Sequence, residues 1–395
     1  MKTAKRLQTV SEYYFSKKLA EVRQMLGEGK PVINMGIGNP DLPPPPLAVR
    51  AMQEALSEPH AHQYQSYRGI PELRRAMAAF YREHFKVELN DATEILPLMG
   101  AKEGIMHISM AFLNEGDEVL IPDPGYATYT SVTRLVQAVP RYYTLEAENG
   151  WLPDIKTLEK ENPDKVKLMW LSYPHMPTGA KASEAAFEKL VAFAKKHHII
   201  LVNDNPYSFI LNEEPLSMMK LEGAKAVGME LNSLSKSFNM AGWRVGMLTG
   251  SAPHIDAVLK VKSNMDSGMF YPLQKGAVAA LQSHKDWFRE LNSIYRKRRT
   301  GIFQLAFLLG CTYDTGAAGM FVWAKLPGML TSEAFSDTLL HEKHIFVTPG
   351  TVFGSKGEGY VRFSLCVPEA QIKEAIARVQ TGKPDDFSGI NNSAI

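Results

Sequence analysis

The chain has 395 residues, which is long enough for two domains, and its 45% hydrophobic and 22% charged content is ordinary for a globular protein. Its 44 Lys and Arg residues nearly balance its 42 Asp and Glu residues, so the overall charge gives no reason to bind nucleic acid. Two distant cysteines, Cys311 and Cys366, lack the spacing of a disulfide framework or a zinc site, and we expect no metal centre.

The N-terminal segment, residues 1–26, is charged and amphipathic and lacks the apolar core of a signal peptide. Elsewhere no apolar run approaches the roughly 18 residues that are needed to cross a bilayer. We therefore expect a cytoplasmic protein with no membrane partner.

Short apolar runs alternate with amphipathic helical stretches through the middle of the chain. The runs are residues 94–99, 118–121, 166–171, 198–203, 229–234 and 245–250. Strands that alternate with helices predict an α/β fold with a mostly parallel sheet covered by helices on both faces. In such sheets, ligands bind where the strands end and the loops begin.

The two ends of the chain have a different pattern. Residues 1–35 are mostly helical in pattern, and after residue 280 helices alternate with three short strand-like runs, 321–326, 345–350 and 360–365. We predict a large domain over 36–279 and a smaller, discontinuous α/β domain made of 1–35 and 280–395. The proline-rich run 40–46 would be a stiff connector between them, and the last dozen residues a frayed tail.

The segment SLSKSFNMAGWRVG, residues 233–246, begins at the end of a predicted strand. It suits an aldehyde cofactor that carries a phosphate. Lys236 would supply the amine for a Schiff base, and Ser233, Ser235 and Arg244 would hold the phosphate. A loop lysine with a surface arginine is the simpler interpretation of Lys236 taken alone.

Asp204 and Tyr207 follow an earlier predicted strand, residues 198–203, in the sequence NDNPY. A carboxylate at that sheet edge can pair with a protonated pyridine nitrogen, and Tyr207 could reach the hydroxyl of the same ring. Asn, Asp and Pro also favour turns, so a turn is the alternative, and the two interpretations are compatible.

Two further segments fit the same kind of cofactor. Gly100, Ala101 and Lys102 open a predicted helix, whose N-terminal N–H groups would cradle a phosphate. Tyr126, in PDPGYATY, could stack on the cofactor ring. Each has an ordinary alternative, since glycine before a helix is common and an aromatic ring can simply be packed.

Together these segments, in this order, resemble the class I/II aminotransferases of the fold-type I pyridoxal-phosphate (PLP) family. The resemblance extends from GIGNPD at residue 36 to VRFSL at residue 361. It implies the fold-type I PLP-transferase fold and PLP as cofactor, with Lys236 as the Schiff-base lysine and Arg244, eight residues later, as the phosphate ligand. The Asp204 and Tyr207 pair and the stacking Tyr126 match as well.

The resemblance assigns several more residues individually. Arg362 matches the arginine that binds the substrate α-carboxylate, and Gly38 matches the glycine beside the substrate. Tyr64 matches the tyrosine that reaches the phosphate of the neighbouring subunit's cofactor, and Ser267 could reach across in the same way. These positions imply a homodimer.

One position departs from the family pattern. The family segment N-P-T-G places an asparagine against the ring hydroxyl, whereas this chain reads SYPHMPTG and places Met176 there. Methionine cannot donate that hydrogen bond. We predict a retuned cofactor site, in which Tyr207 still donates and His175 could compensate, while Pro206 stiffens the adjoining turn.

The resemblance therefore implies an aminotransferase that moves an amino group from an L-amino acid to a 2-oxo acid, with 2-oxoglutarate as the expected acceptor, by a ping-pong mechanism. The motifs are most similar to the subgroup of LL-diaminopimelate and alanine-type aminotransferases. One alternative is a PLP-dependent carbon–sulfur β-lyase. A second is a non-catalytic PLP-binding protein, and a third is a degenerate dimer without cofactor.

Overall fold

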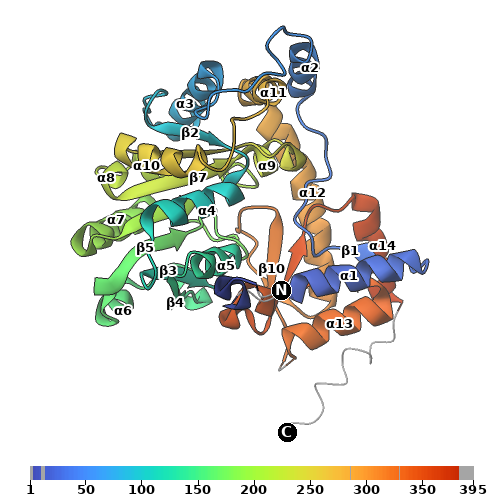
Figure 1. Ribbon diagram of the computed structural model, residues 1–395. Coiled ribbons are helices and arrows are strands. Elements are labelled where there is room, and N and C mark those ends of the chain that lie inside the picture. Colours follow the sequence, from blue (N-terminus) through green and yellow to red (C-terminus); the bar gives the residue numbers. More distant parts are fainter. Residues whose placement is uncertain (1–2, 10–13, 285, 329, 382–395) are drawn as a thin grey trace.

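A seven-stranded sheet forms the centre of the computed structural model, which describes residues 3–9, 14–284, 286–328 and 330–381 (Figure 1). Its strand order is β2-β8-β7-β6-β5-β3-β4, and only β8 runs antiparallel to its neighbours. The strands are β2 (Ile95–Leu98), β3 (Glu118–Asp123), β4 (Val139–Thr144), β5 (Val166–Leu171), β6 (Ile200–Asp204), β7 (Gly228–Ser233) and β8 (Gly246–Gly250). The predicted mostly parallel sheet is confirmed. The predicted tail lies outside the described residues.

The sequence patterns missed strand β4. Its residues, VPRYYT, are largely polar or exposed, and only Tyr143 is buried. It lies at the edge of the sheet beside β3, where Pro140 can be accommodated. An edge strand has no continuous apolar run, because part of it faces solvent.

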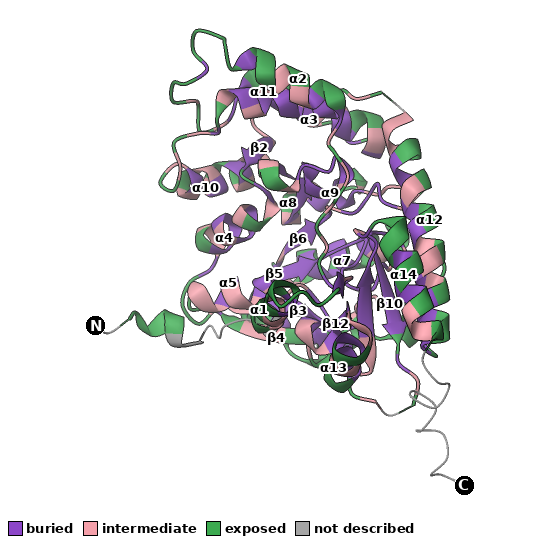
Figure 2. Cartoon of the chain, turned by 90° about the vertical axis from the view of Figure 1, so that its right-hand side faces the viewer, coloured by how far each residue is buried: buried purple, intermediate pink, exposed green. Residues whose placement is uncertain are grey.

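Helices cover both faces of this sheet. On one face lie α4 (Ala101–Phe112), α5 (Thr128–Leu135) and α10 (Ala252–Lys262), whose apolar residues pack on the strands. On the other lie α3 (Pro71–Phe85), α7 (Glu184–His197) and α11 (Tyr271–Leu281), with α2 (Pro46–Ala55) along α11. Figure 2 shows the strands buried between helices whose outer faces are exposed. The short helices are α6 (Ile155–Lys160), α8 (Ala224–Val227) and α9 (Leu234–Ser237).

The C-terminal part forms a second core around a four-stranded antiparallel sheet. Its order is β12 (Thr348–Pro349), β13 (Tyr360–Ser364), β10 (Phe321–Lys325) and β9 (Thr312–Tyr313). Helices α12 (Asp286–Leu308), α13 (Ser332–Lys343) and α14 (Glu369–Gln380) pack with it. Within the described residues, the 3₁₀ helices are Lys5–Thr9, Ala147–Asn149, Pro163–Lys165, Met218–Lys220, Ala241–Trp243, Gly350–Phe353 and Ser355–Gly357.

The N-terminal segment joins this second core. Strand β1 (Ile33–Asn34) pairs in parallel with β11 (Ile345–Phe346), and α1 (Tyr14–Gly27) buries Val22 and Met25 with Leu340 and Phe346 (Figure 1). The exact domain boundaries, at 35/36 and 279/280, stay a prediction. Of the helices described, none is long and apolar enough to cross a membrane.

The topology brings the predicted site segments to one edge of the large sheet. Asp204 is the last residue of β6 and Ser233 the last of β7, and these parallel strands end side by side. Gly100 follows β2 and Tyr126 follows β3 at the same edge. The rule that ligands bind at the carboxyl ends of parallel strands therefore points to this edge.

Candidate active site

A cavity of about 510 Å³ opens at this edge, between the large sheet and the C-terminal core. Twelve of the predicted site residues line it: Gly38, Ala101, Lys102, Tyr126, Met176, Asp204, Tyr207, Ser233, Ser235, Lys236, Arg244 and Arg362. Gly100 lies directly behind Arg244, whereas Tyr64 does not line the cavity. Residues from seven segments of the chain thus meet in one place.

Lys236 is held inside the cavity by the short helix α9. Its Nζ donates a 2.6 Å hydrogen bond to the backbone oxygen of Gly38, which belongs to the N-terminal segment. Burial lowers the pKa of the Lys236 amine, and the nearby guanidinium groups of Arg362 and Arg244 lower it further. A lysine with a lowered pKa loses its proton more readily and is a better nucleophile.

The carboxyl group of Asp204 is buried at the end of β6. Its Oδ2 accepts a 2.8 Å hydrogen bond from the Tyr129 hydroxyl, and its Oδ1 has no hydrogen-bond partner among the described residues. Burial raises the pKa of Asp204 to about 6, although the Tyr129 hydrogen bond acts in the opposite direction. A buried acceptor without a partner is costly, so this oxygen can pair with a cationic group of a ligand.

Polar groups for an anion gather at the other end of the cavity. The start of α4 presents backbone N–H groups at Ala101 and Lys102. A Cβ at Gly100, where φ is +89°, would lie 2.1 Å from Nη2 of Arg244, so only glycine lets that guanidinium approach. Ser233 accepts a hydrogen bond from the backbone N–H of Ser235 and thereby orders the turn before Lys236.

Arg362 lies on strand β13 of the C-terminal core, between two aromatic rings. Its guanidinium carbon is 3.9 Å from the ring centroid of Phe321 and 4.6 Å from that of Phe353. Its Nη2 donates to the backbone oxygen of Gly36 at 2.8 Å, and its Nη1 is 3.3 Å from the sulfur of Met176. The residue that departs from the family pattern thus contacts Arg362 directly.

The sequence patterns missed five residues that line this cavity: Tyr129, Phe321, Ile105, Ser172 and Ala241. Tyr129 comes three residues after Tyr126, stacks on Trp170 with ring centroids 4.9 Å apart, and binds Asp204. Its place in the segment PDPGYATY is the available signal, but the pattern assigns the stacking role there to Tyr126 alone. Phe321 begins strand β10, and nothing in its sequence pattern separates it from an ordinary core residue.

His175 lies beside Met176 but does not line the cavity. Its Nδ1 is 2.8 Å from the Thr178 hydroxyl, and burial lowers the pKa of its ring to about 3. The suggestion that His175 compensates for Met176 therefore gains no support from its position. Pro206 does line the cavity, between Asp204 and Tyr207.

The sequence matches the family described as aminotransferase class I and II over residues 30–379. The chain belongs to this family. This chain is 40% identical to a curated LL-diaminopimelate aminotransferase from Dehalococcoides mccartyi, over 97% of this chain and 99% of that protein. It is 38% identical to one from Oleidesulfovibrio alaskensis over 95% and 98% of the two chains.

Solved structures agree with this assignment. Substrate-bound BacF from Bacillus subtilis superposes with a TM-score of 0.92, at 37% identity over 96% of this chain and 97% of that chain. An aminotransferase from Staphylococcus aureus superposes with a TM-score of 0.87, at 32% identity over 95% and 98% of the two chains. The fold-type I architecture predicted from the sequence is confirmed, and the protein is a PLP-dependent aminotransferase.

The cavity fits this cofactor chemically at several points. The unpartnered Oδ1 of Asp204 suits a protonated pyridine nitrogen, and the buried Lys236 amine suits an aldehyde carbon. Arg244 and the N-terminus of α4 suit a phosphate. The ring nitrogen, the aldehyde and the phosphate of PLP thus each have a chemically suitable protein group in the cavity.

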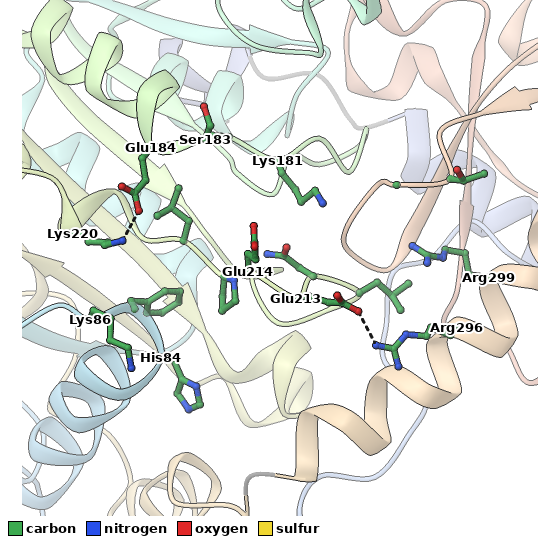
Figure 3. Close-up of a pocket in the computed structure, with 18 residues that line it drawn as sticks. His84, Lys86, Lys181, Ser183, Glu184, Glu213, Glu214, Lys220, Arg296 and Arg299 are labelled. Atoms are coloured by element: carbon green, nitrogen blue, oxygen red, sulfur yellow. Dashed lines mark hydrogen bonds and ion pairs between the residues drawn. The ribbon is translucent and has the colours of Figure 1, made fainter.

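A larger cavity of about 830 Å³ lies elsewhere, between the loop 211–216, the start of α7 and helix α12 (Figure 3). Charged side chains dominate its wall, and several already pair with one another, as in Lys220 with Glu184 and Arg296 with Glu213. None of the predicted site residues lines it. Size alone therefore does not mark the active site of this aminotransferase.

Proposed function

We propose that this aminotransferase moves the amino group of an L-amino acid to a 2-oxo acid, with 2-oxoglutarate as the acceptor, by a ping-pong mechanism. The observation that carries the proposal is the meeting of Lys236, Asp204 and Arg362 in one cavity. The names of the curated relatives make LL-diaminopimelate the first donor to test.

PLP, when bound, supplies an electron sink conjugated to the substrate α-carbon. In our proposal the Asp204 carboxylate holds the ring nitrogen protonated and Tyr126 covers the face of the ring. Ser233, Ser235, Arg244 and the residues 100–102 bind the phosphate. Tyr207 donates to the ring hydroxyl, and Met176 lies where the family's asparagine would donate a second hydrogen bond.

The substrate is oriented by Arg362, whose planar guanidinium can bind the α-carboxylate in a bidentate manner. The contacts with Phe321 and Phe353 fix the plane of that guanidinium. Gly38 brings its backbone beside the substrate, close to Lys236. The Lys236 amine would then take the proton from the substrate α-carbon as general base and, as general acid, deliver it to the former aldehyde carbon of the cofactor.

We also propose that the active unit is a homodimer, in which Tyr64 reaches the neighbouring subunit's cofactor phosphate. Tyr64 is 90% exposed in this single chain, which is unusual for a large aromatic side chain and favours burial by a partner. Other large exposed side chains lie nearby: Tyr67 follows Tyr64 in the same loop, and Met265 and Phe270 flank the adjoining loop.

A single-turnover experiment tests the reaction type. The PLP-loaded protein is mixed with one L-amino acid at a time, beginning with LL-diaminopimelate, and the visible absorbance of the bound cofactor is followed without any oxo acid. Loss of the band, and its return on adding 2-oxoglutarate, supports the proposal. Accumulation of pyruvate and ammonia without an acceptor would instead identify a carbon–sulfur β-lyase, and failure to bind PLP a protein without this chemistry.

A further inference from the structure

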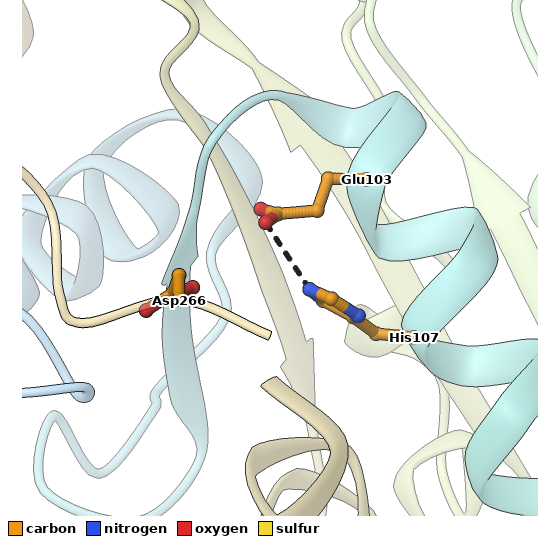
Figure 4. Close-up of side chains that lie close together, drawn as sticks. All are labelled: Glu103, His107 and Asp266. Carbon is orange, nitrogen blue, oxygen red and sulfur yellow. Dashed lines mark ion pairs between the residues drawn. The ribbon is translucent and has the colours of Figure 1, made fainter. Parts of the chain in front are cut away.

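A largely buried cluster of titratable side chains lies between helix α4 and the segment that follows α10 (Figure 4). Glu103 and His107 are on α4, with Oε1 and Nε2 3.2 Å apart. Asp266 comes from the opposite segment, and one donor atom from each of the three residues lies within 4.8 Å of the others. The side chains of His107 and Asp266 are only 3% and 5% exposed.

A fourth residue, Lys262, completes the cluster. Its side chain has no exposed surface, and its Nζ lies 2.7 Å from Oδ2 of Asp266. Lys262 thus supplies a cationic counter-charge to the Asp266 carboxylate. A buried ion pair fixes geometry strongly, because neither partner can be removed without leaving a buried charge.

The cluster holds a loop in place. Oδ1 of Asp266 accepts a 2.8 Å hydrogen bond from the backbone N–H of Gly268, whose φ is +85°. A Cβ at Gly268 would lie 2.3 Å from the backbone oxygen of Gln65, so this loop packs directly on the backbone next to Tyr64. Asp266 therefore holds in place the loop on which the backbone beside Tyr64 packs.

Gln274 makes a second tie between the same two segments. This fully buried side chain donates from Nε2 to the backbone oxygen of Met269 at 2.6 Å and accepts at Oε1 from the N–H of Ile70 at 2.8 Å. These two hydrogen bonds hold residues 266–269 against residues 65–70, the segment that directly follows Tyr64.

Glu103 of the cluster is also hydrogen-bonded to the turn that precedes α4. Oε2 of Glu103 accepts a 2.6 Å hydrogen bond from the backbone N–H of Met99, immediately before Gly100 and the start of α4. Glu103 makes this bond from α4, whereas Asp266 is the member of the cluster that is hydrogen-bonded to the loop beside Tyr64.

We propose that Asp266, through its pairing with Lys262, positions Tyr64 for the neighbouring subunit's cofactor phosphate, so that Asp266 controls PLP binding in the partner's active site. This inference rests on the proposed homodimer and on the proposed role of Tyr64. Asp266 is a positioning residue, because it does not line the cavity of its own subunit.

Hybrid dimers separate this effect from a general loss of stability. Two differently tagged chains are combined, one of which carries Lys236→Ala, so that only one Lys236 per dimer can form the visible band with PLP. Asp266→Asn is placed either on the Lys236→Ala chain, whose Tyr64 serves the remaining band-forming site, or on the chain that keeps Lys236. The band is titrated with PLP and with pyridoxal, which has no phosphate.

We expect Asp266→Asn on the Lys236→Ala chain to raise the half-saturating PLP concentration roughly tenfold or more and to leave pyridoxal titration unchanged. On the other chain it should change neither titration. Equal effects in both placements, or an equal effect on pyridoxal, would overturn the proposal. The matched control is Glu374→Gln on α14. It also removes a carboxylate from an i,i+4 ion pair, here with Arg378, and should have no effect in either placement.

A second variant guards against misfolding, because Asp266→Asn leaves the buried Lys262 without its counter-charge. Lys262→Met combined with Asp266→Asn removes both charges, keeps an oxygen acceptor for the Gly268 N–H, and should reproduce the effect on the partner's site. Stoichiometric Zn²⁺ binding to the wild type that Asp266→Asn abolishes would identify a metal site and overturn the proposal.

Two measurements distinguish failure of the inference from failure of the proposed function. Sedimentation of the wild-type protein as a monomer would refute the homodimer and the inference with it. In the same hybrids, Tyr64→Phe on the Lys236→Ala chain should weaken PLP binding. If Tyr64→Phe acts and both Asp266 variants do not, only the present inference is wrong.

Discussion

The buried carboxyl group of Asp204 should make the cofactor-free protein less stable at neutral than at mildly acidic pH. Burial raises the pKa of Asp204 in the folded protein from the ordinary 3.8 to about 6. The folded state therefore binds this proton more tightly than the unfolded state, so stability falls as the pH rises from about 4 to about 6. At pH 7 the ionised carboxylate costs about 3 kcal/mol, of which about 1 kcal/mol is recovered at pH 5.

Urea unfolding of the cofactor-free wild type and of Asp204→Asn, each at pH 7 and pH 5, measures this contribution. The amide cannot titrate, so any constant effect of the substitution cancels between the two pH values. We expect the wild type to gain about 1 kcal/mol relative to the variant on going from pH 7 to pH 5. If the free energy of unfolding changes by the same amount in both proteins, within about 0.3 kcal/mol, then burial does not raise the pKa of Asp204 and the reasoning fails.

The same pair of proteins connects stability with function. PLP loading should remove the pH-dependent difference, because a protonated ring nitrogen would supply the positive charge that the unpartnered Oδ1 of Asp204 lacks. Asp204→Asn should still bind PLP but transaminate far more slowly. A loaded wild type that keeps the full difference would contradict the proposed pairing.

Four further substitutions have defined outcomes. Lys236→Ala should lower kcat by at least roughly 10²- to 10⁴-fold in a steady-state assay while the unfolding transition stays in place, because the general acid and base is lost. Arg362→Lys should lower kcat/KM roughly 10- to 150-fold, since a lysine cannot make the bidentate pair, and an unchanged KM and kcat would exclude Arg362 as the carboxylate ligand. Met176→Asn should tighten PLP binding about 2- to 12-fold in equilibrium titration, through one added hydrogen bond, and weaker binding would show that the thioether contact with Arg362 matters more. Gly100→Ala should weaken binding of PLP much more than of pyridoxal, because its Cβ would displace the Arg244 guanidinium, and equal losses would point to general misfolding.

Much of the fold could be predicted because its signals are local. Six of the seven strands of the central sheet have apolar runs that are visible in the sequence, and the helices between them follow from amphipathic periodicity. Lys236, Asp204, Tyr126 and Gly100 could be found because each stands at or shortly after the end of such a run, and the carboxyl ends of parallel strands meet at one edge. The family resemblance then assigned the remaining positions.

Contacts between distant segments depended on the tertiary structure alone. The hydrogen bond from Lys236 to Gly38 joins residues 198 positions apart, and the rings around Arg362 come from two other segments of the C-terminal part. The sequence indicates residue types and local periodicity but not which side chains become neighbours. For the same reason, only the tertiary structure shows the roles of Tyr129 and Phe321 and the contact of Asp266 with the loop beside Tyr64. Burial removes water from polar groups, and the packing of distant segments then determines which partners they find.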